Sequence, residues 1–136
     1  MKELAITAVI ENIEQVTDFI NSELERYGCS LKVEMQIDVA IDEIFGNICR
    51  YAYSPDTGEA AVRLVVENEP LCAVISFIDR GKPFNPLDAA EPDITLSAEQ
   101  RKVGGLGIFI VRKTMDEVSY SYSEGQNILT IRKNLM

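Results

Sequence analysis

The chain has 136 residues, of which 46% are hydrophobic, and it carries a formal net charge of -9 with no histidine. This apolar content suits one self-sufficient core over residues 1–136, and the negative charge argues against binding to nucleic acid or to an anionic membrane surface. Without histidine, the chain has no Ser-His-Asp or Cys-His catalysis, no histidine metal site and no phosphohistidine relay.

The first third of the chain predicts a strand and two helices. Residues Glu3 to Ala8 indicate a short strand. Asn12, followed three residues later by Gln15, is typical of a helix start, and apolar residues at three- and four-residue intervals predict an amphipathic helix that stops at Gly28. A second helix is expected from about Leu31 to about Tyr53. Its predicted core stripe is Ile37, Ile41, Ile44 and Ile48.

Two strands and a long irregular segment follow. Ala60 to Glu67 alternates as a half-exposed strand does, whereas Leu71 to Asp79 is almost continuously apolar and is expected at the centre of the sheet. From Arg80 to about Gly104 periodicity is lost. Irregular segments of this length are usually functional lids or disordered.

The last third predicts a helix from Leu106 to Met115 and a closing hairpin. Its strands are Val118 to Tyr122 and Ile128 to Lys133, joined by residues 124–127. The element order predicts an α+β, two-layer sandwich, in which a mixed, largely antiparallel sheet is covered by helices on one face.

The cysteines and the apolar segments indicate the cellular compartment of the protein. Cys29, Cys49 and Cys72 are odd in number and lack C-x-x-C spacing, so we expect reduced, buried thiols instead of a disulfide framework or a zinc site. No stretch resembles a signal peptide or has membrane length, so we expect a cytoplasmic protein.

Three local patterns could carry chemistry. Glu43 and Asn47 are one helical turn apart, away from the isoleucine stripe; a carboxylate beside an amide oxygen suits proton transfer next to a hard cation. The plainer interpretation is a solvated helix face. Asp79 closes a buried strand and Gly81 follows, so the carboxylate could accept a hydrogen bond from an exocyclic amine while the glycine admits a flat base; an ordinary turn explains the same pair.

The third pattern is Arg101-Lys102-Val103-Gly104-Gly105-Leu106-Gly107, directly before the last helix. Glycines at a helix start expose backbone N–H groups to an anion, and the helix dipole and the two basic residues add positive potential. A flexible hinge with solvated charges is the alternative. The cluster lacks the spacing of a dinucleotide fingerprint or of a Walker P-loop.

Together the three patterns match one family in order and spacing. Residues 42–53 (DEIFGNICRYAY), 79–86 (DRGKPFNP) and 104–111 (GGLGIFIV) closely resemble the conserved boxes of the GHKL ATPase superfamily. Within it, the chain is similar over essentially its whole length to the anti-sigma-factor serine/threonine-protein kinases. The resemblance implies a Bergerat-type ATP-binding fold with a mobile lid at about residues 80–104.

The resemblance also implies roles for individual residues. Glu43 would be the general base toward a serine or threonine hydroxyl, Asn47 would coordinate Mg²⁺, and Asp79 would bind the adenine amine. The other residues implied to contact the nucleotide are Arg50, Gly81, Phe84, Arg101, Lys102, Gly104, Gly105, Leu106 and Gly107. The chain departs from the family at Pro83, where many relatives have glycine, at Tyr51, where they often have histidine, and at Ile128, where many carry a threonine near the adenine.

The function implied is a kinase that uses ATP and Mg²⁺ to phosphorylate an anti-sigma factor antagonist of the STAS type and that also sequesters a sigma factor. A homodimer is expected. The alternative is a catalytically silent module in which ATP only switches affinity for a partner; Glu43 favours the kinase, since a nucleotide-gated clamp needs no carboxylate above the γ-phosphate. A third possibility, a domain that binds no nucleotide, would require three coincidental boxes in the right order.

Overall fold

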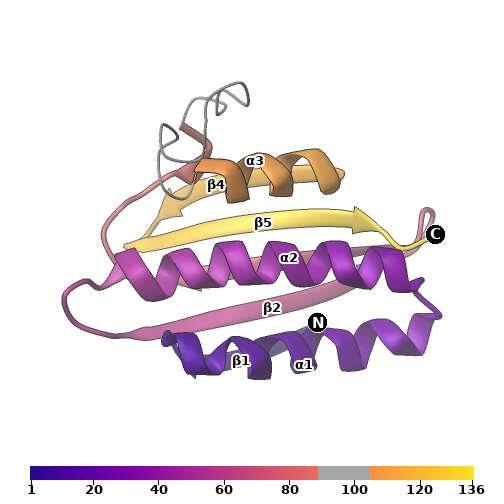
Figure 1. The fold of residues 1–136 in the computed structure, drawn as a ribbon, viewed down its shortest axis with the longest axis horizontal. Coiled ribbons are helices and arrows are strands. Elements are labelled where there is room, and N and C mark those ends of the chain that lie inside the picture. Colours follow the sequence, from indigo (N-terminus) through magenta and orange to yellow (C-terminus); the bar gives the residue numbers. More distant parts are fainter. Residues whose placement is uncertain (89–104) are drawn as a thin grey trace.

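Three helices lie side by side on one face of a five-stranded sheet in the computed structural model, which describes residues 1–88 and 105–136 (Figure 1). The strands are β1 (Lys2–Thr7), β2 (Glu59–Glu67), β3 (Cys72–Asp79), β4 (Glu117–Ser123) and β5 (Gln126–Asn134). The helices are α1 (Ile13–Leu24), α2 (Leu31–Asn47) and α3 (Gly105–Thr114). This arrangement confirms the predicted two-layer α+β sandwich.

The strand order is β1-β2-β3-β5-β4, so β3 lies at the centre of the sheet as its apolar run predicts. All four pairings among the described strands are antiparallel, and the sheet is therefore more regular than the mixed arrangement that we expected. The pairing of β3 with β5 sets Asp79 opposite Asn127 and Ile78 opposite Ile128. Consecutive residues of a strand point to opposite faces of the sheet, so Asn127 lies on the same face as Asp79 and Ile128 lies on the other face.

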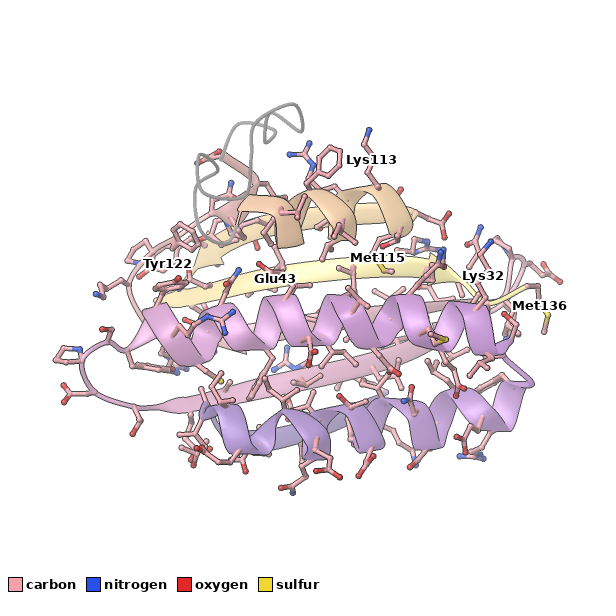
Figure 2. The ribbon with its side chains drawn as sticks, viewed as in Figure 1. Lys32, Glu43, Lys113, Met115, Tyr122 and Met136 are labelled. Carbon is pink, nitrogen blue, oxygen red and sulfur yellow. The ribbon has the colours of Figure 1, made fainter. Side chains whose placement is uncertain are left out.

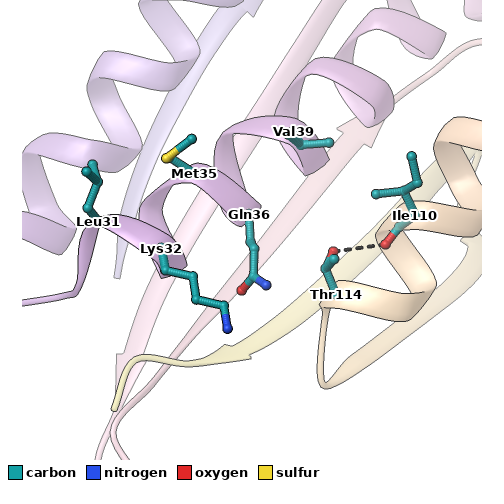
Figure 3. A pocket seen from close by; sticks show the side chains of 7 residues that line it. All are labelled: Leu31, Lys32, Met35, Gln36, Val39, Ile110 and Thr114. Carbon is teal, nitrogen blue, oxygen red and sulfur yellow. Dashed lines mark hydrogen bonds between the residues drawn. The ribbon is translucent and has the colours of Figure 1, made fainter.

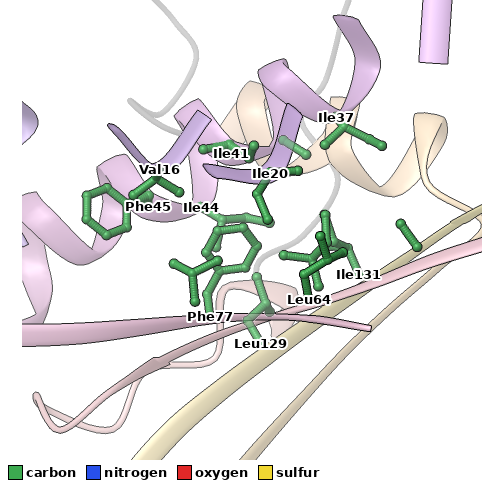
Figure 4. Close-up of a cluster of buried hydrophobic side chains, with 14 of the residues drawn as sticks. Val16, Ile20, Ile37, Ile41, Ile44, Phe45, Leu64, Phe77, Leu129 and Ile131 are labelled. Atoms are coloured by element: carbon green, nitrogen blue, oxygen red, sulfur yellow. The ribbon is translucent and has the colours of Figure 1, made fainter. Parts of the chain in front are cut away.

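The hydrophobic core fills the space between the helices and the sheet (Figure 4). The predicted stripe of α2 is buried, since Ile37, Ile41, Ile44 and Ile48 are each at most 8% exposed. From α1, Val16, Ile20 and Leu24 are fully buried against it. Burial of such side chains contributes roughly 1.5–3 kcal/mol each, which explains why α2 is held firmly as the central helix of its layer.

Local hydrogen bonds define the ends of α1 and the start of α2. Ser30 caps α2, because its hydroxyl accepts from the backbone N–H of Val33 at 3.3 Å. The helix start predicted at Asn12 is confirmed, because α1 begins at Ile13, but no side-chain bond caps it, and the Asn12 amide donates to the carbonyl of Thr7 at 2.9 Å instead. At its other end α1 runs into a 3₁₀ turn and stops at Gly28, which has a positive φ of 69°.

The second helix ends in an unusual way. After Asn47 the chain continues through a π-helical turn, Ile48–Ala52, before it leaves the helix layer near Tyr53, where we expected the helix to end. The predicted third helix and closing hairpin are present, but the hairpin turn is shorter than expected, because β5 already begins at Gln126. Asn127 therefore belongs to a strand and not to the turn.

The cysteines are less buried than expected, because Cys29 and Cys49 are only partly buried. All three cysteines lie among the described residues and none forms a disulfide. Cys72 is buried, and partial burial raises the pKa of the Cys49 thiol to about 11, so this thiol stays protonated. No helix in residues 1–88 or 105–136 combines the length and the apolar character needed to cross a membrane.

Candidate functional site

The carboxylate of Glu43 lies against the first turn of α3. Figure 2 shows the Glu43 side chain leaving α2 on the side that faces α3. A Cβ atom placed on Gly107, the third residue of α3, would overlap the Glu43 carboxyl group, so only a glycine permits this approach. The acid therefore sits beside the N-terminal end of a helix, where exposed N–H groups and the helix dipole favour negative charge.

Two further polar side chains continue this arrangement along α2. The Asn47 amide donates to Glu43 Oε1 at 3.3 Å, and the guanidinium of Arg50 lies 3.5 Å from Asn47 Oδ1. Glu43 and Asn47 are both partly buried, whereas Arg50 is exposed. The helix face that the plainer interpretation leaves to solvent thus carries a connected row of Glu43, Asn47 and Arg50. This row leads from the first turn of α3 to the π-helical turn.

Asp79 forms the second part of the site at the end of β3. It is one of two buried polar residues in the described chain, at 6% exposure, and its Oδ1 accepts from the backbone N–H of Gly81 at 2.9 Å and from the Asn127 amide at 3.0 Å. These bonds explain how a carboxylate remains buried with no basic partner in residues 1–88 or 105–136.

The strand end and the helix end are joined directly. Lys82 donates its backbone N–H to the carbonyl of Ala52 at 3.0 Å, and a Cβ atom on Gly81 would overlap that same carbonyl group. Tyr53 adds a second connection, because its hydroxyl accepts from the N–H of Arg80 at 2.8 Å and donates to the carbonyl of Glu59 at 2.6 Å. The Asp79 loop is therefore packed on the π-helical turn that follows α2, the helix that carries Glu43.

The remaining predicted residues fall into two groups. Phe84 has an exposed ring, at 55%, and its backbone N–H is bound by Asn127, while Leu106 is 38% exposed in the first turn of α3. Arg101, Lys102 and Gly104, together with residues 89–104 of the predicted lid, lie outside the described residues.

Asn127 is the residue that the sequence analysis missed. The chain carries Ile128 where many relatives have a threonine near the adenine, but Ile128 pairs with Ile78 and points to the face opposite to Asp79. Asn127 takes the position beside Asp79, and the alternation of buried Asn127, Leu129 and Ile131 was the signal that could have revealed it.

A separate groove of about 460 Å³ lies at the far end of the α2–α3 seam (Figure 3). Its walls are mainly apolar, and several of them are exposed, including Leu31 at 71% and Met35 at 58%. It contains one charged side chain, Lys32, and no acid. The groove therefore lacks the carboxylates and glycine-flanked helix tip of the candidate site.

Comparison with known proteins gives a consistent result. A family model described as histidine kinase-like ATPase domain matches residues 6–133. Serine/threonine-protein kinase BtrW of Bordetella bronchiseptica is 26% identical over 102 residues, which cover 75% of this chain and 71% of that protein. Serine-protein kinase RsbW of Listeria monocytogenes is 27% identical over 109 residues, covering 76% and 68%.

Among solved structures, the crystal structure of the RsbU and RsbW domains of a Mycobacterium tuberculosis protein superposes with a TM-score of 0.64 at 18% identity. It covers 99% of this chain, and this chain spans 33% of the length of that protein. The likeness shows a shared fold.

Proposed function

The chain belongs to the histidine kinase-like ATPase domain family, and from that premise we propose that it transfers the γ-phosphoryl group of ATP to a serine or threonine of a partner protein. The family match confirms the resemblance to GHKL ATPases that the sequence motifs carry, and an ATPase domain implies ATP as the ligand. The observation that carries the proposal further is the contact of Glu43 with the Gly107 turn of α3, which sets an acid beside a helix N-terminus, the kind of structure that binds phosphate.

The adenine end and the phosphate end of the proposed site follow from these contacts. Asp79 offers a carboxylate oxygen to an exocyclic amine, and Gly81 keeps the neighbouring backbone free of a side chain. At the other end, the N-terminal turn of α3 offers backbone N–H groups to the phosphates. The phosphate end contacts Glu43 of α2 and the adenine end packs on Ala52 in the π-helical turn that directly follows α2, so one continuous helical segment sets their separation.

Asn47 fits a magnesium ion bound mainly through substrate phosphates. Its Oδ1 has only the long contact to Arg50 among the described residues, so a hard oxygen donor is available there. The described residues contain no cluster of three or more acidic, cysteine or histidine side chains that could hold a metal alone, which agrees with a cation that needs ATP. Mg²⁺, when bound, would neutralise charge on the phosphates.

The chain's own residues would then carry out two tasks. The α3 tip holds the triphosphate. Glu43 accepts the proton of the substrate hydroxyl while the oxygen of that hydroxyl bonds to the γ-phosphorus. The bond between the γ-phosphorus and the bridging oxygen breaks, and ADP leaves with that oxygen. Positioning and charge neutralisation supply most of the rate in such a reaction.

We further propose that the phosphorylated partner is an anti-sigma factor antagonist of the STAS type and that the chain also binds a sigma factor, acting as a homodimer in the cytoplasm. The names of the relatives support the kinase part of this proposal, since both are called serine or serine/threonine-protein kinases. The acidic net charge of -9 suits a basic face on a partner.

The test is to incubate the protein with γ-labelled ATP, Mg²⁺ and candidate antagonists from its own genome, and to compare Glu43→Gln with Asn47→Ala. Glu43→Gln should bind ATP nearly as well as the wild type but transfer phosphate about 10²–10⁴-fold more slowly, because only the base is lost. Asn47→Ala should lose the Mg²⁺-dependent part of ATP binding.

Three outcomes would contradict parts of the proposal. If calorimetry detects no adenine nucleotide binding to the wild type, the whole function is wrong. If Asn47→Ala keeps Mg²⁺-dependent binding, the metal assignment is wrong. If the wild type binds ATP and labels no candidate, while Glu43→Gln still binds a partner, the chain is a nucleotide-gated binding module.

A further inference from the structure

The side-chain amide of Asn127 uses all of its hydrogen-bonding capacity inside the protein. Its Nδ2 donates to Asp79 Oδ1 at 3.0 Å and to the carbonyl of Lys82 at 2.9 Å. Its Oδ1 accepts from the backbone N–H of Phe84 at 3.1 Å and from the hydroxyl of Tyr120. Because a backbone N–H can only donate, the bond to Phe84 fixes which atom of the amide is oxygen and which is nitrogen.

These bonds determine what Asp79 can offer to a ligand. Both protein donors, the Gly81 N–H and the Asn127 amide, bind Oδ1, and Oδ2 has no partner among the described residues. The carboxylate is thus held by one oxygen and presents the other as an acceptor. The same Asn127 amide also holds the backbone at residues 82–84, the segment that leaves the site toward α3 in the sequence.

We propose that Asn127 is a positioning residue for nucleotide recognition, which fixes Asp79 so that one carboxylate oxygen selects an amino group over a carbonyl group on the base. This inference rests on the proposed ATP-binding function. Adenine carries an amino group at the position where guanine carries a carbonyl oxygen, so a fixed carboxylate acceptor favours adenosine nucleotides and repels guanosine nucleotides. Asn127 acts through Asp79 and does not itself need to touch the base.

The surroundings of Asn127 keep this arrangement in one protonation state. Burial is the main cause that raises the pKa of Tyr120, so its hydroxyl retains the proton that it donates to Asn127. Asp79, Asp88 and Tyr122 are the titratable residues that act on the Tyr120 hydroxyl, and Arg80 and Lys82 are the charged residues of the segment that follows Asp79. Because a side-chain amide does not titrate, the donor that Asn127 offers to Asp79 does not depend on pH.

The first test is Asn127→Asp, which keeps the shape of the side chain but replaces the amide donor with a second carboxyl group beside Asp79. Two adjacent carboxylates share a proton, which restores a donor at low pH and is lost as the pH rises. We expect the affinity of the variant for ATP, divided by that of the wild type, to fall about tenfold or more between about pH 5.5 and about pH 8.5. Asn68→Asp, the same change at an exposed turn residue, should leave this ratio constant.

The second test is Asn127→Leu, which removes the donor and the acceptor together. We expect the preference for ATP over GTP to shrink about tenfold, which corresponds to about 1.4 kcal/mol of discrimination. The exchange of the Phe84 amide hydrogen should accelerate, because its acceptor is gone, and this measurement requires no nucleotide.

Different results overturn different statements. If Asn127→Asp follows the wild type at every pH, or if Asn127→Leu folds and keeps both the nucleotide preference and the Phe84 protection, Asn127 does not position Asp79. If the wild type itself binds no adenine nucleotide, the proposed function fails instead. In that case the pH dependence of unfolding of Asn127→Asp, relative to Asn68→Asp, still decides whether residue 127 controls the Asp79 carboxylate.

Discussion

Gly107 can be tested by adding a single methyl group. The Cβ of an alanine would overlap the carboxyl group of Glu43, which is the free end of a flexible side chain and can move aside. We expect Gly107→Ala to change the free energy of unfolding by less than about 1 kcal/mol, since alanine also favours the helix. Phosphoryl transfer should fall at least about tenfold, because the displaced acid no longer meets the substrate hydroxyl. Urea unfolding and phosphate transfer assays separate the two effects.

Gly81→Ala is the matched variant with the opposite expectation. There the added Cβ would overlap the carbonyl group of Ala52, and backbone in a packed turn cannot move aside as a side chain does. We expect Gly81→Ala to lower the free energy of unfolding by about 1–3 kcal/mol. Equal losses of stability in both variants would contradict the view that Gly107 faces a movable acid and Gly81 a fixed wall.

At the same scale, the residues of the site differ in how well the sequence could predict them. Asp79 and Gly81 stand out because a charged residue and a glycine interrupt an apolar run. Asn127 does not, because an asparagine two residues after the Glu124-Gly125 turn is typical of a loop, and its burial depends on the register with β3. One residue of register separates Asn127 from Ile128, and that difference decides which side chain faces Asp79.

At the scale of elements, Tyr53 connects three of them. It follows the π-helical turn and bridges the start of β2 to the residue after β3 through its hydroxyl. We expect Tyr53→Phe to lower the free energy of unfolding by about 1–2 kcal/mol, because the N–H of Arg80 loses its partner while the ring keeps its packing. Tyr51→Phe, in the exposed part of the same turn, should cost almost nothing. Similar losses in both variants would show that the bridge does not hold the elements together.

Element boundaries illustrate the limits of local signals. Both helix starts lie where we expected them, but Ser30 caps α2 with a side-chain bond, whereas the Asn12 amide binds Thr7 and leaves the start of α1 without one. The sequence of residues 48–52 does not predict a π-helical turn. The turn forms where the chain after α2 packs against the Gly81 loop.

For the whole molecule, the alternation of apolar residues in β2 and the almost continuous apolar run of β3 were sufficient to predict both strands, and hence the layers. Short connections favoured antiparallel neighbours, which the sheet has throughout. The meeting of Glu43 with Gly107 could not be derived in this way. These residues are distant in the chain, and only the family resemblance linked them before the helix packing was known.

Glu34 of α2 is an acidic side chain that is only partly exposed in this acidic protein. Burial, followed by the nearby Glu25 and Asp38, raises the pKa of Glu34, whose Oε1 is buried without a hydrogen-bond partner. An acid whose pKa is higher in the folded state releases its proton more readily on unfolding. The folded state is therefore favoured while Glu34 remains protonated, and that advantage disappears as the pH rises through the folded-state pKa.

We accordingly expect Glu34→Gln to be more stable than the wild type at about pH 8 and to lose this advantage as the pH falls toward 5, because glutamine has no charge to bury. Glu14→Gln is the matched control, since it removes the same charge from an exposed position on α1. Urea unfolding of all three proteins across this range measures the effect. An equal gain in the control would show that the total charge of -9, and not the local burial of Glu34, opposes folding.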